Sequence, residues 1–325
     1  MNLRDALCSS PTIFPLNLDA TGTIVQVVSL LENDYREASF LDNRAIKPSS
    51  RLAVIRWPEL AEAAEGLMAN CDFIFHISHA GSTLLSRLLG NHPNCHSVRE
   101  PAILRLLAQK QYSERLSTFL GLWSRTFRPE QRTILKATSF VSEIGSELMN
   151  LVLNSRALLM YVPPETFLPS LLDGAMSDIT NEANSRLARL QNRGFCRDLI
   201  LANLSPGECV AMSWLSEMLS LAEIAKNHPE RTGWLHFEHF LKEPERQLGL
   251  CFHHFNIQAD ASSILSSTTM DRYAKRPDVK YDTAFRQKLI AQSTEKFQDE
   301  VQRGLRWLSS NESALACLPT YAEPT

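Results

Sequence analysis

The sequence predicts a helix-rich α/β fold with a central, mainly parallel sheet. Short apolar runs alternate with longer amphipathic runs along the 325 residues, and this alternation is typical of βα units. With 44% hydrophobic and 21% charged residues, the chain also carries enough apolar side chains for a sizeable core. We therefore exclude a disordered, collagen-like or coiled-coil protein.

The core strands are predicted from four runs that are short and apolar enough for parallel strands buried on both faces. These runs are residues 71–78, 132–139, 156–162 and 232–238. Amphipathic patterns between and after them predict helices at 82–90, 101–127 in two pieces, 140–153, 164–176, 179–193, 207–227, 244–255 and 283–309. Helix therefore outweighs strand.

The first 70 residues follow a different pattern. Residues 23–31 predict a strand, and residues 58–70 predict a capped helix that leads into the first core strand. We therefore expect residues 1–70 to form an N-terminal extension packed on the core, and residues 71–325 to form the α/β domain.

The charges of the chain nearly balance, because 33 Lys and Arg stand against 36 Asp and Glu and the net charge is −3. No overall basic field would draw the chain to nucleic acid or to an acidic membrane, so we expect neither partner. No window reaches the ~18 apolar residues of a membrane helix, and the start lacks the pattern of a signal peptide. We expect a cytoplasmic protein, and the oligomeric state stays open.

The cysteines and histidines do not predict a metal site. The seven cysteines are odd in number, scattered, and form no C-x-x-C pair. This spacing argues against a disulfide framework and against a thiolate zinc site, so we expect buried free thiols. The nine histidines form no H-E-x-x-H spacing, so no metal is expected.

The most informative stretch is CDFIFHISHAGSTLLSRLLGNHP, where an apolar strand runs through a polar turn into a leucine-periodic helix. The first turn of such a helix has unpaired N–H groups and partial positive charge, which favour an anion. Gly81 allows close backbone approach, and Ser82 and Thr83 add hydroxyl donors. The loop is not a Walker A motif, because no lysine follows the glycine. A plain strand-to-helix turn capped by serine is the alternative.

Four segments, in order, resemble the bacterial type of P-loop sulfotransferases, which take sulfate from 3′-phosphoadenosine 5′-phosphosulfate (PAPS). They are SHAGSTLL with the following NHP and REP, RALLMYV with PPETFLPSLL, WLHFEHFLKEPERQLGLCFHHFNI, and MDRYAKRPDVKYD. The resemblance covers about residues 71–282. It implies a P-loop NTPase-like three-layer sandwich and PAPS as the co-substrate, without a metal.

The resemblance also implies which residues would bind PAPS. The first segment is similar to the family's 5′-phosphosulfate loop, and the second to its 3′-phosphate motif. The implied binding residues are Ser78, His79, Ala80, Gly81, Ser82 and Thr83 in the loop, Ser170 in the 3′-phosphate motif, and Arg186, Lys275 and Arg276 as further cations. Two positions depart from the family: His79 replaces the usual lysine, and Val162 replaces the usual arginine. Arg186, Arg189 and Arg193 form one basic helix face, which is either solvated or reaches the phosphate.

Glu100 is the implied general base, since related family members use a glutamate in this region to take the acceptor proton. Partial burial would raise the pKa of such a carboxyl. The alternatives are a pair with Arg99 or a cap of the helix beginning at Pro101, and His79 is a rival base. Lys136 and Thr138 fall where relatives place an acceptor-side base or a phosphate-facing lysine; a strand-end lysine reaching solvent is the alternative.

The expected function is therefore transfer of a sulfuryl group from PAPS to a hydroxyl or amine of an unidentified small-molecule or peptide acceptor. A nucleotide-dependent, kinase-like phosphotransferase is an alternative, but it needs a loop lysine and a metal-binding acid that are not evident. A non-catalytic nucleotide-binding protein of the same fold is the other alternative, and it is favoured by Val162, where a 3′-phosphate would lack its arginine.

Overall fold

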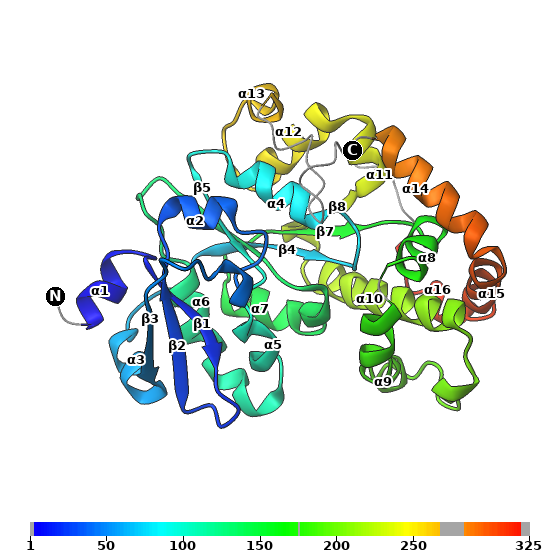
Figure 1. The fold of residues 1–325 in the computed structure, drawn as a ribbon, viewed down its shortest axis with the longest axis horizontal. Coiled ribbons are helices and arrows are strands. Elements are labelled where there is room, and N and C mark those ends of the chain that lie inside the picture. Colours follow the sequence, from blue (N-terminus) through cyan, green and yellow to red (C-terminus); the bar gives the residue numbers. More distant parts are fainter. Residues whose placement is uncertain (1–2, 175, 267–282, 320–325) are drawn as a thin grey trace.

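The computed structural model describes residues 3–174, 176–266 and 283–319, and its centre is a five-stranded parallel sheet (Figure 1). The strand order is β5-β6-β4-β7-β8. The strands are β4 (Cys71–His76), β5 (Cys95–Arg99), β6 (Arg132–Lys136), β7 (Ala157–Tyr161) and β8 (Thr232–His236). All four neighbouring pairs are parallel, so the predicted helix-rich α/β fold and its mainly parallel sheet are confirmed.

The sheet lies between two layers of helices. Helices α4 and α12 lie on one face, and α7 and α10 lie on the other (Figure 1). The helices of this part are α4 (Ser82–Gly90), α5 (Ile103–Leu107), α6 (Leu116–Trp123), α7 (Gly145–Leu151), α8 (Pro164–Leu172), α9 (Met176–Asn192), α10 (Pro206–Asn227), α11 (Phe237–Lys242), α12 (Pro244–His254), α13 (Ala261–Leu265), α14 (Thr283–Lys296), α15 (Gln298–Ser309) and α16 (Glu312–Leu315). Short 3₁₀ turns are η2 (Lys110–Arg115), η3 (Ser139–Ile144), η4 (Leu201–Asn203) and η5 (Pro229–Arg231).

Strand β5 was not predicted, because three of its five residues are polar and its pattern is not that of a buried strand. All five are nevertheless buried. The hydroxyl of Ser97 lies 2.8 Å from that of Ser86, and Arg99 donates to backbone carbonyls. Tertiary hydrogen bonds therefore replace the apolar side chains that a sequence pattern needs.

Helix α10 is the central helix of its layer. Its start is fixed by a capping box, in which the Ser205 hydroxyl accepts the Glu208 N–H and the Glu208 carboxylate accepts the Ser205 N–H. Helix α15 crosses it very closely, because a Cβ at Gly207 would lie 1.9 Å from the Glu300 carbonyl oxygen. A buried stripe of α15, with Val301, Gly304 and Leu308, faces this contact. The predicted helix 283–309 is thus two helices that meet at Phe297.

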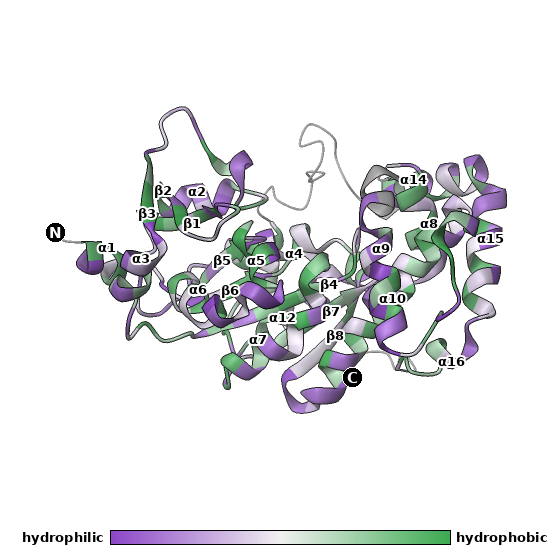
Figure 2. Cartoon of the chain, turned by 90° about the horizontal axis from the view of Figure 1, so that it is seen from below, coloured by the Kyte–Doolittle hydropathy of each residue, from purple (hydrophilic) through white to green (hydrophobic). Residues whose placement is uncertain are grey.

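The N-terminal part contains a second, antiparallel sheet with the order β1-β2-β3 (Figure 2). Its elements are α1 (Leu3–Ser9), β1 (Ile13–Leu18), β2 (Ile24–Ser29), α2 (Glu32–Glu37), η1 (Asn43–Ala45), β3 (Leu52–Arg56) and α3 (Trp57–Ala63). The predicted strand at 23–31 is found as β2, but its two partner strands were not predicted. The predicted helix at 58–70 ends already at Ala63.

Two buried arginines join the N-terminal part to the rest of the chain. Arg125 donates to the carbonyls of Leu122, Leu7, Ser10 and Ile13 at 2.7–2.8 Å. Arg99 donates to the carbonyls of Tyr35 at 2.7 Å and Ala38 at 2.6 Å, among others. Burial lowers the pKa of Arg125 to about 10 and that of Arg99 to about 9, so both stay charged at neutral pH.

The structure answers two smaller predictions. All seven cysteines are free thiols, but only Cys71, Cys95 and Cys251 are buried as expected. Cys196 and Cys209 are partly exposed, and Cys8 and Cys317 are exposed. Among the residues that the structure describes, none of the helices combines the length and the apolar character needed to cross a bilayer.

Candidate active site

The loop between β4 and α4 has the backbone geometry of an anion-binding turn. His79 and Gly81 are both left-handed, with φ of 58° and 72°. Left-handed residues in a short turn direct successive N–H groups to one side, and α4 begins directly after them with its own unpaired N–H groups. A left-handed histidine is also strained, and strain of this kind gathers at functional sites.

Gly81 is required by a protein neighbour as well as by its backbone conformation. A Cβ at this position would lie 2.0 Å from Cε2 of Phe237, the first residue of α11. The ring of Phe237 therefore packs directly on the loop. The sequence predicts that a ligand contacts the backbone of Gly81 closely, but on the side where a Cβ would lie the Phe237 ring makes this contact instead.

Ser78 is fixed within the protein by a buried carboxylate of α10. Its N–H donates to Glu217 Oε2 at 2.7 Å, and its hydroxyl donates to Glu217 Oε1 at 3.2 Å. The same hydroxyl lies 3.0 Å from the Ser139 hydroxyl, at the start of η3. The amide and the hydroxyl of Ser78 thus hold the loop in place. The sequence predicted that Ser78 binds a nucleotide, but it did not predict this structural role.

The predicted basic face of α9 points inward. Arg186 Nη2 donates to Glu217 Oε1 at 2.6 Å and lies 3.1 Å from Glu182 Oε2. Arg189 donates to the carbonyl of Phe140 at 2.5 Å, and Arg193 contacts Glu143 at 3.0 Å. The alternative of a solvated face is therefore wrong. Arg186 is connected to the loop through Glu217, which accepts hydrogen bonds from both Arg186 and Ser78.

A buried ion pair lies at the carboxyl edge of the sheet, beside the loop. Lys136, the last residue of β6, donates to Oε1 of Glu100, which directly follows β5. His76, the last residue of β4, places Nε2 at 3.8 Å from the same oxygen. The Lys136 side chain is 1% exposed and that of Glu100 is 17% exposed. Open α/β sheets bind ligands at this edge.

These contacts correct two predictions. Glu100 does not pair with Arg99, whose side chain points away into the N-terminal part. Lys136 does not reach solvent, because its ammonium is buried on Glu100. Glu100 is also left-handed, with φ of 48°, so the site holds a second strained non-glycine residue besides His79.

The ionisation of this cluster follows from burial and neighbouring charge. Burial alone would raise the pKa of Glu100, but the Lys136 ammonium outweighs it and holds the pKa below its ordinary value. Glu100 is therefore a carboxylate at neutral pH, and the expected rise of its pKa is wrong. Burial, with Lys136, lowers the pKa of His76 to about 4, so this imidazole is neutral. Its Nδ1 lies 2.9 Å from the Ile77 carbonyl, whereas Nε2 is buried without a hydrogen-bond partner.

The N-terminal part supplies one wall of this cluster. The Lys136 ammonium lies 5.5 Å from the centroid of the Phe40 ring, and the Arg44 guanidinium covers the same ring at 3.8 Å. The backbone of Leu41 holds this segment in place by donating to the Arg99 carbonyl at 2.7 Å. Sequence reasoning missed this wall, because it consists of a loop without a motif.

Arg105, in the middle of the short helix α5, reaches the same edge. Its Nη2 donates to the Thr138 hydroxyl at 3.3 Å, and its Nη1 lies 3.6 Å from Glu182 Oε1. Thr138 is buried beside the ion pair. Polar contacts therefore connect the loop, α10, α9 and α5 around the carboxyl edge.

Two of the positions that the sequence assigns to the 3′-phosphate, Val162 and Ser170, lie just before α8 and within it. The Ser170 hydroxyl donates to the Thr166 carbonyl at 2.7 Å, one turn earlier in the helix. Val162 is fully buried, and its carbonyl accepts the Trp214 indole N–H at 2.9 Å, so an arginine at 162 would have to enter the core. Lys275 and Arg276 lie outside the described residues.

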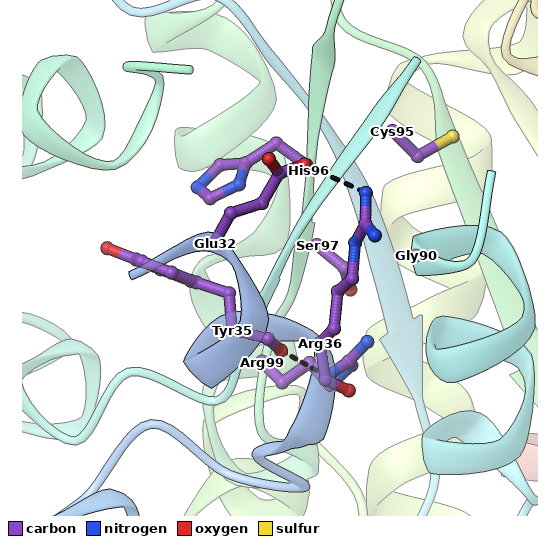
Figure 3. Close-up of a pocket in the computed structure, with 8 residues that line it drawn as sticks. All are labelled: Glu32, Tyr35, Arg36, Gly90, Cys95, His96, Ser97 and Arg99. Carbon is purple, nitrogen blue, oxygen red and sulfur yellow. Dashed lines mark hydrogen bonds and ion pairs between the residues drawn. The ribbon is translucent and has the colours of Figure 1, made fainter. Parts of the chain in front are cut away.

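A small, open recess lies at the other end of α4, near Gly90, and is not part of this site (Figure 3). Its lining includes Glu32, Arg36, His96 and Arg99. The charges there are already paired: Glu32 contacts Arg36 at 2.8 Å and Arg128 at 2.8 Å. We interpret the recess as part of the junction with the N-terminal part.

One residue of the site carried a signal that sequence reasoning overlooked. Glu217 lies on the same helical stripe of α10 as Val210, Trp214 and Leu221, all of which are buried. A carboxylate at a core position of an amphipathic helix needs a partner, and this alone marks it for attention. Phe237 carried no comparable signal.

The chain is similar to several solved structures of sulfotransferases, at low sequence identity. No protein-family model matches the chain, and no curated protein matches it. The sulfotransferase domain from the curacin biosynthetic pathway is 15% identical, covering 74% of this chain and 98% of that domain, with a TM-score of 0.41. A sulfotransferase from Mycobacterium avium is 13% identical, covers 74% and 79%, and has a TM-score of 0.39. One from Alicyclobacillus acidocaldarius is 14% identical, covers 74% and 96%, and has a TM-score of 0.36. All three bear the name of the family that the sequence motifs resemble.

Proposed function

We propose that the protein transfers a sulfuryl group from PAPS to a hydroxyl or amine of an acceptor. One observation carries this proposal: a left-handed, glycine-containing loop before a helix N-terminus lies next to a buried carboxylate–lysine pair at the same sheet edge. The loop suits a phosphosulfate, and the carboxylate suits the removal of a proton. His76 connects the two, since it precedes the loop and lies 3.8 Å from Glu100.

The donor would bind at the loop. Amide groups at the start of α4, with the hydroxyls of Ser82 and Thr83, would hold the 5′-phosphosulfate and stabilise the charge that develops on the leaving phosphate. His79 and Ala80 belong to the same turn. For the 3′-phosphate, Ser170 is a proposed donor, with Lys275 and Arg276 as proposed cations outside the described residues.

The acceptor would bind between the loop and Glu100. The acceptor oxygen or nitrogen gives its proton to the Glu100 carboxylate and forms a bond to sulfur. The bond from sulfur to the bridging oxygen breaks, and adenosine 3′,5′-bisphosphate leaves with the electron pair. Lys136 keeps Glu100 ionised and therefore ready to accept at neutral pH. Positioning and electrostatics supply most of the rate in such a transfer.

Thermal unfolding with three ligands tests the proposal. A ligand at a hundred times its dissociation constant adds about 2.7 kcal/mol of stability. We expect this from adenosine 3′,5′-bisphosphate, and not from AMP or Mg-ATP at the same concentration. Stabilisation by Mg-ATP alone would favour the kinase-like alternative. Binding of the bisphosphate without sulfuryl transfer to any phenol, alcohol or amine would leave a nucleotide-binding protein.

A further inference from the structure

The loop is held by a negative charge, which is an unusual anchor for an anion site. Glu217 is 1% exposed and accepts the N–H and the hydroxyl of Ser78, three residues before Gly81. A buried carboxylate acts over several ångströms, because the protein screens charge far less than water does. Left alone, Glu217 would oppose every phosphate or sulfate that enters the loop.

Arg186 supplies the opposite charge. Its side chain is 4% exposed, and Nη2 lies 2.6 Å from Glu217 Oε1. Glu182 approaches the same nitrogen at 3.1 Å, but from a more exposed position, where water screens it. Within residues 3–174, 176–266 and 283–319, Arg186 is therefore the cation that forms an ion pair with the carboxylate that holds the loop.

Arg186 differs from an arginine with a purely structural role elsewhere in the protein. Arg125 places Nε, Nη1 and Nη2 on backbone carbonyls. Arg186 instead has a buried Nη1 without a hydrogen-bond partner, and its described contacts through Nη2 are to carboxylates. The hydrogen bonding of the Arg186 guanidinium is incomplete. The presence of an arginine at this position is therefore better explained by its positive charge than by its hydrogen bonds or its packing.

We propose that Glu217 is a positioning residue for the anion loop, and that Arg186 neutralises it so that the loop can bind an anion beside a carboxylate. Neither residue needs to touch the ligand: Glu217 acts through Ser78, and Arg186 acts through Glu217. This inference rests on the proposed function, since it concerns the same loop.

Calorimetric titration of the folded variants with adenosine 3′,5′-bisphosphate and with inorganic pyrophosphate tests it. In Arg186→Met the Glu217 carboxylate loses its ion-pair partner, so we expect about tenfold weaker binding. In the double variant Arg186→Met/Glu217→Gln neither charge of this pair remains, while the amide oxygen of the introduced glutamine still accepts the Ser78 N–H, so binding should return to within about threefold of wild type. Arg193→Met removes a charge from the same helix face without contacting Glu217, and should bind like wild type.

A structural role would give the opposite pattern. A double variant that binds as weakly as Arg186→Met, or more weakly, overturns the inference. Thermal unfolding without ligand shows whether each variant is folded. If Arg186→Met does not fold, Glu217→Gln alone decides: the inference expects tighter binding, by about threefold, and weaker binding overturns it.

The two probes separate this inference from the proposed function. If wild type binds pyrophosphate but not the nucleotide, the proposed function fails, and the variants are compared with pyrophosphate. If wild type binds both and the charge pattern is absent, only the inference fails. If it binds neither, the loop is not an anion site and both fail.

Discussion

Buried charges occur at two places in this protein, and their partners differ. At the junction with the N-terminal part, Arg125 and Arg99 donate mainly to backbone carbonyls, which do not ionise. At the carboxyl edge of the sheet, Lys136 and Arg186 pair with the carboxylates Glu100 and Glu217. A buried cation on carbonyls has one charge state and one task, which is to hold two segments together. A buried cation on a carboxylate also sets the charge that a ligand meets.

The backbone separates the two places in the same way. The carboxyl edge contains the left-handed residues His79, Gly81 and Glu100. None of the described residues that form the arginine contacts of the junction has a positive φ. The burial of a charge therefore says little by itself about function, whereas a titratable partner and local strain say more.

The largest effect is expected from Glu100→Gln. Glutamine keeps the shape of Glu100 but does not take a proton from the acceptor, so turnover should fall by about 10²–10⁴ while affinity for adenosine 3′,5′-bisphosphate changes little. The measurement is sulfuryl transfer to any acceptor that wild type uses. Unchanged turnover, together with an inactive His79→Ala enzyme, would assign the base to His79 instead.

Arg125→Met tests the junction. It removes the donors of four backbone carbonyls at once, so the free energy of unfolding should fall by about 3–4 kcal/mol, measured by urea denaturation. Binding of adenosine 3′,5′-bisphosphate to the folded protein should not change. Arg51→Met, at an exposed position of the N-terminal part, is the control and should stay within about 0.5 kcal/mol of wild type. Loss of nucleotide affinity in folded Arg125→Met would contradict the separation of the two regions.

Gly81→Ala tests the loop itself. Alanine disfavours the left-handed conformation, and its Cβ would meet the Phe237 ring, so we expect a loss of about 2–4 kcal/mol together with loss of nucleotide binding. Gly66→Ala is a matched control, because Gly66 is also left-handed, with φ of 86°, but has nothing within 4 Å of a Cβ. It should lose only about 1 kcal/mol. Equal losses would mean that the Phe237 contact is unimportant.

The smallest effect concerns one histidine from each region. Burial lowers the pKa of His76 to about 4 and that of His96 to about 3, both from 6.5. The unfolded chain then binds more protons than the folded one, so this stability is fully present above about pH 6.5 and is lost as the pH falls toward the folded pKa. His76→Gln and His96→Gln should each make the fall of stability between pH 6.5 and 4 shallower, by roughly one proton. We expect only His76→Gln to change the pH profile of transfer as well.

Much of the loop could be predicted from the sequence, because its elements are local. A buried apolar strand, a polar turn with Gly81 and a leucine-periodic helix are consecutive, and the helix bounds at 82–90 are confirmed. The partner of Glu100 could not be predicted in this way. In the register of β5 and β6, Lys136 lies opposite Arg99 and not opposite Glu100. Glu100 follows the strand with a left-handed φ of 48°, and its N–H donates to the Lys136 carbonyl at 2.8 Å, so the contact depends on a tertiary pairing and on a local turn that no sequence pattern shows.

Strand β5 and Glu217 show the same limit from another side. Both place polar groups in the core, and sequence patterns treat polar groups as exposed. Their partners, Ser86 for Ser97 and Ser78 for Glu217, come from other segments of the chain. The packing that makes them acceptable appears only when the segments are brought together.

The close crossing of α10 and α15 has a consequence for biosynthesis. Gly207 N–H donates to the Glu300 carboxylate at 2.7 Å, and the two backbones nearly touch at this point. The ribosome releases the helix that carries Glu217 well before it releases α15, so the face of α10 that contacts α15 stays uncovered until α15 has also left the ribosome. During that interval the anion loop has its anchor, but the anchor has no rigid support. Chaperone binding to nascent chains that stop between α10 and α15 is where this delay should become visible.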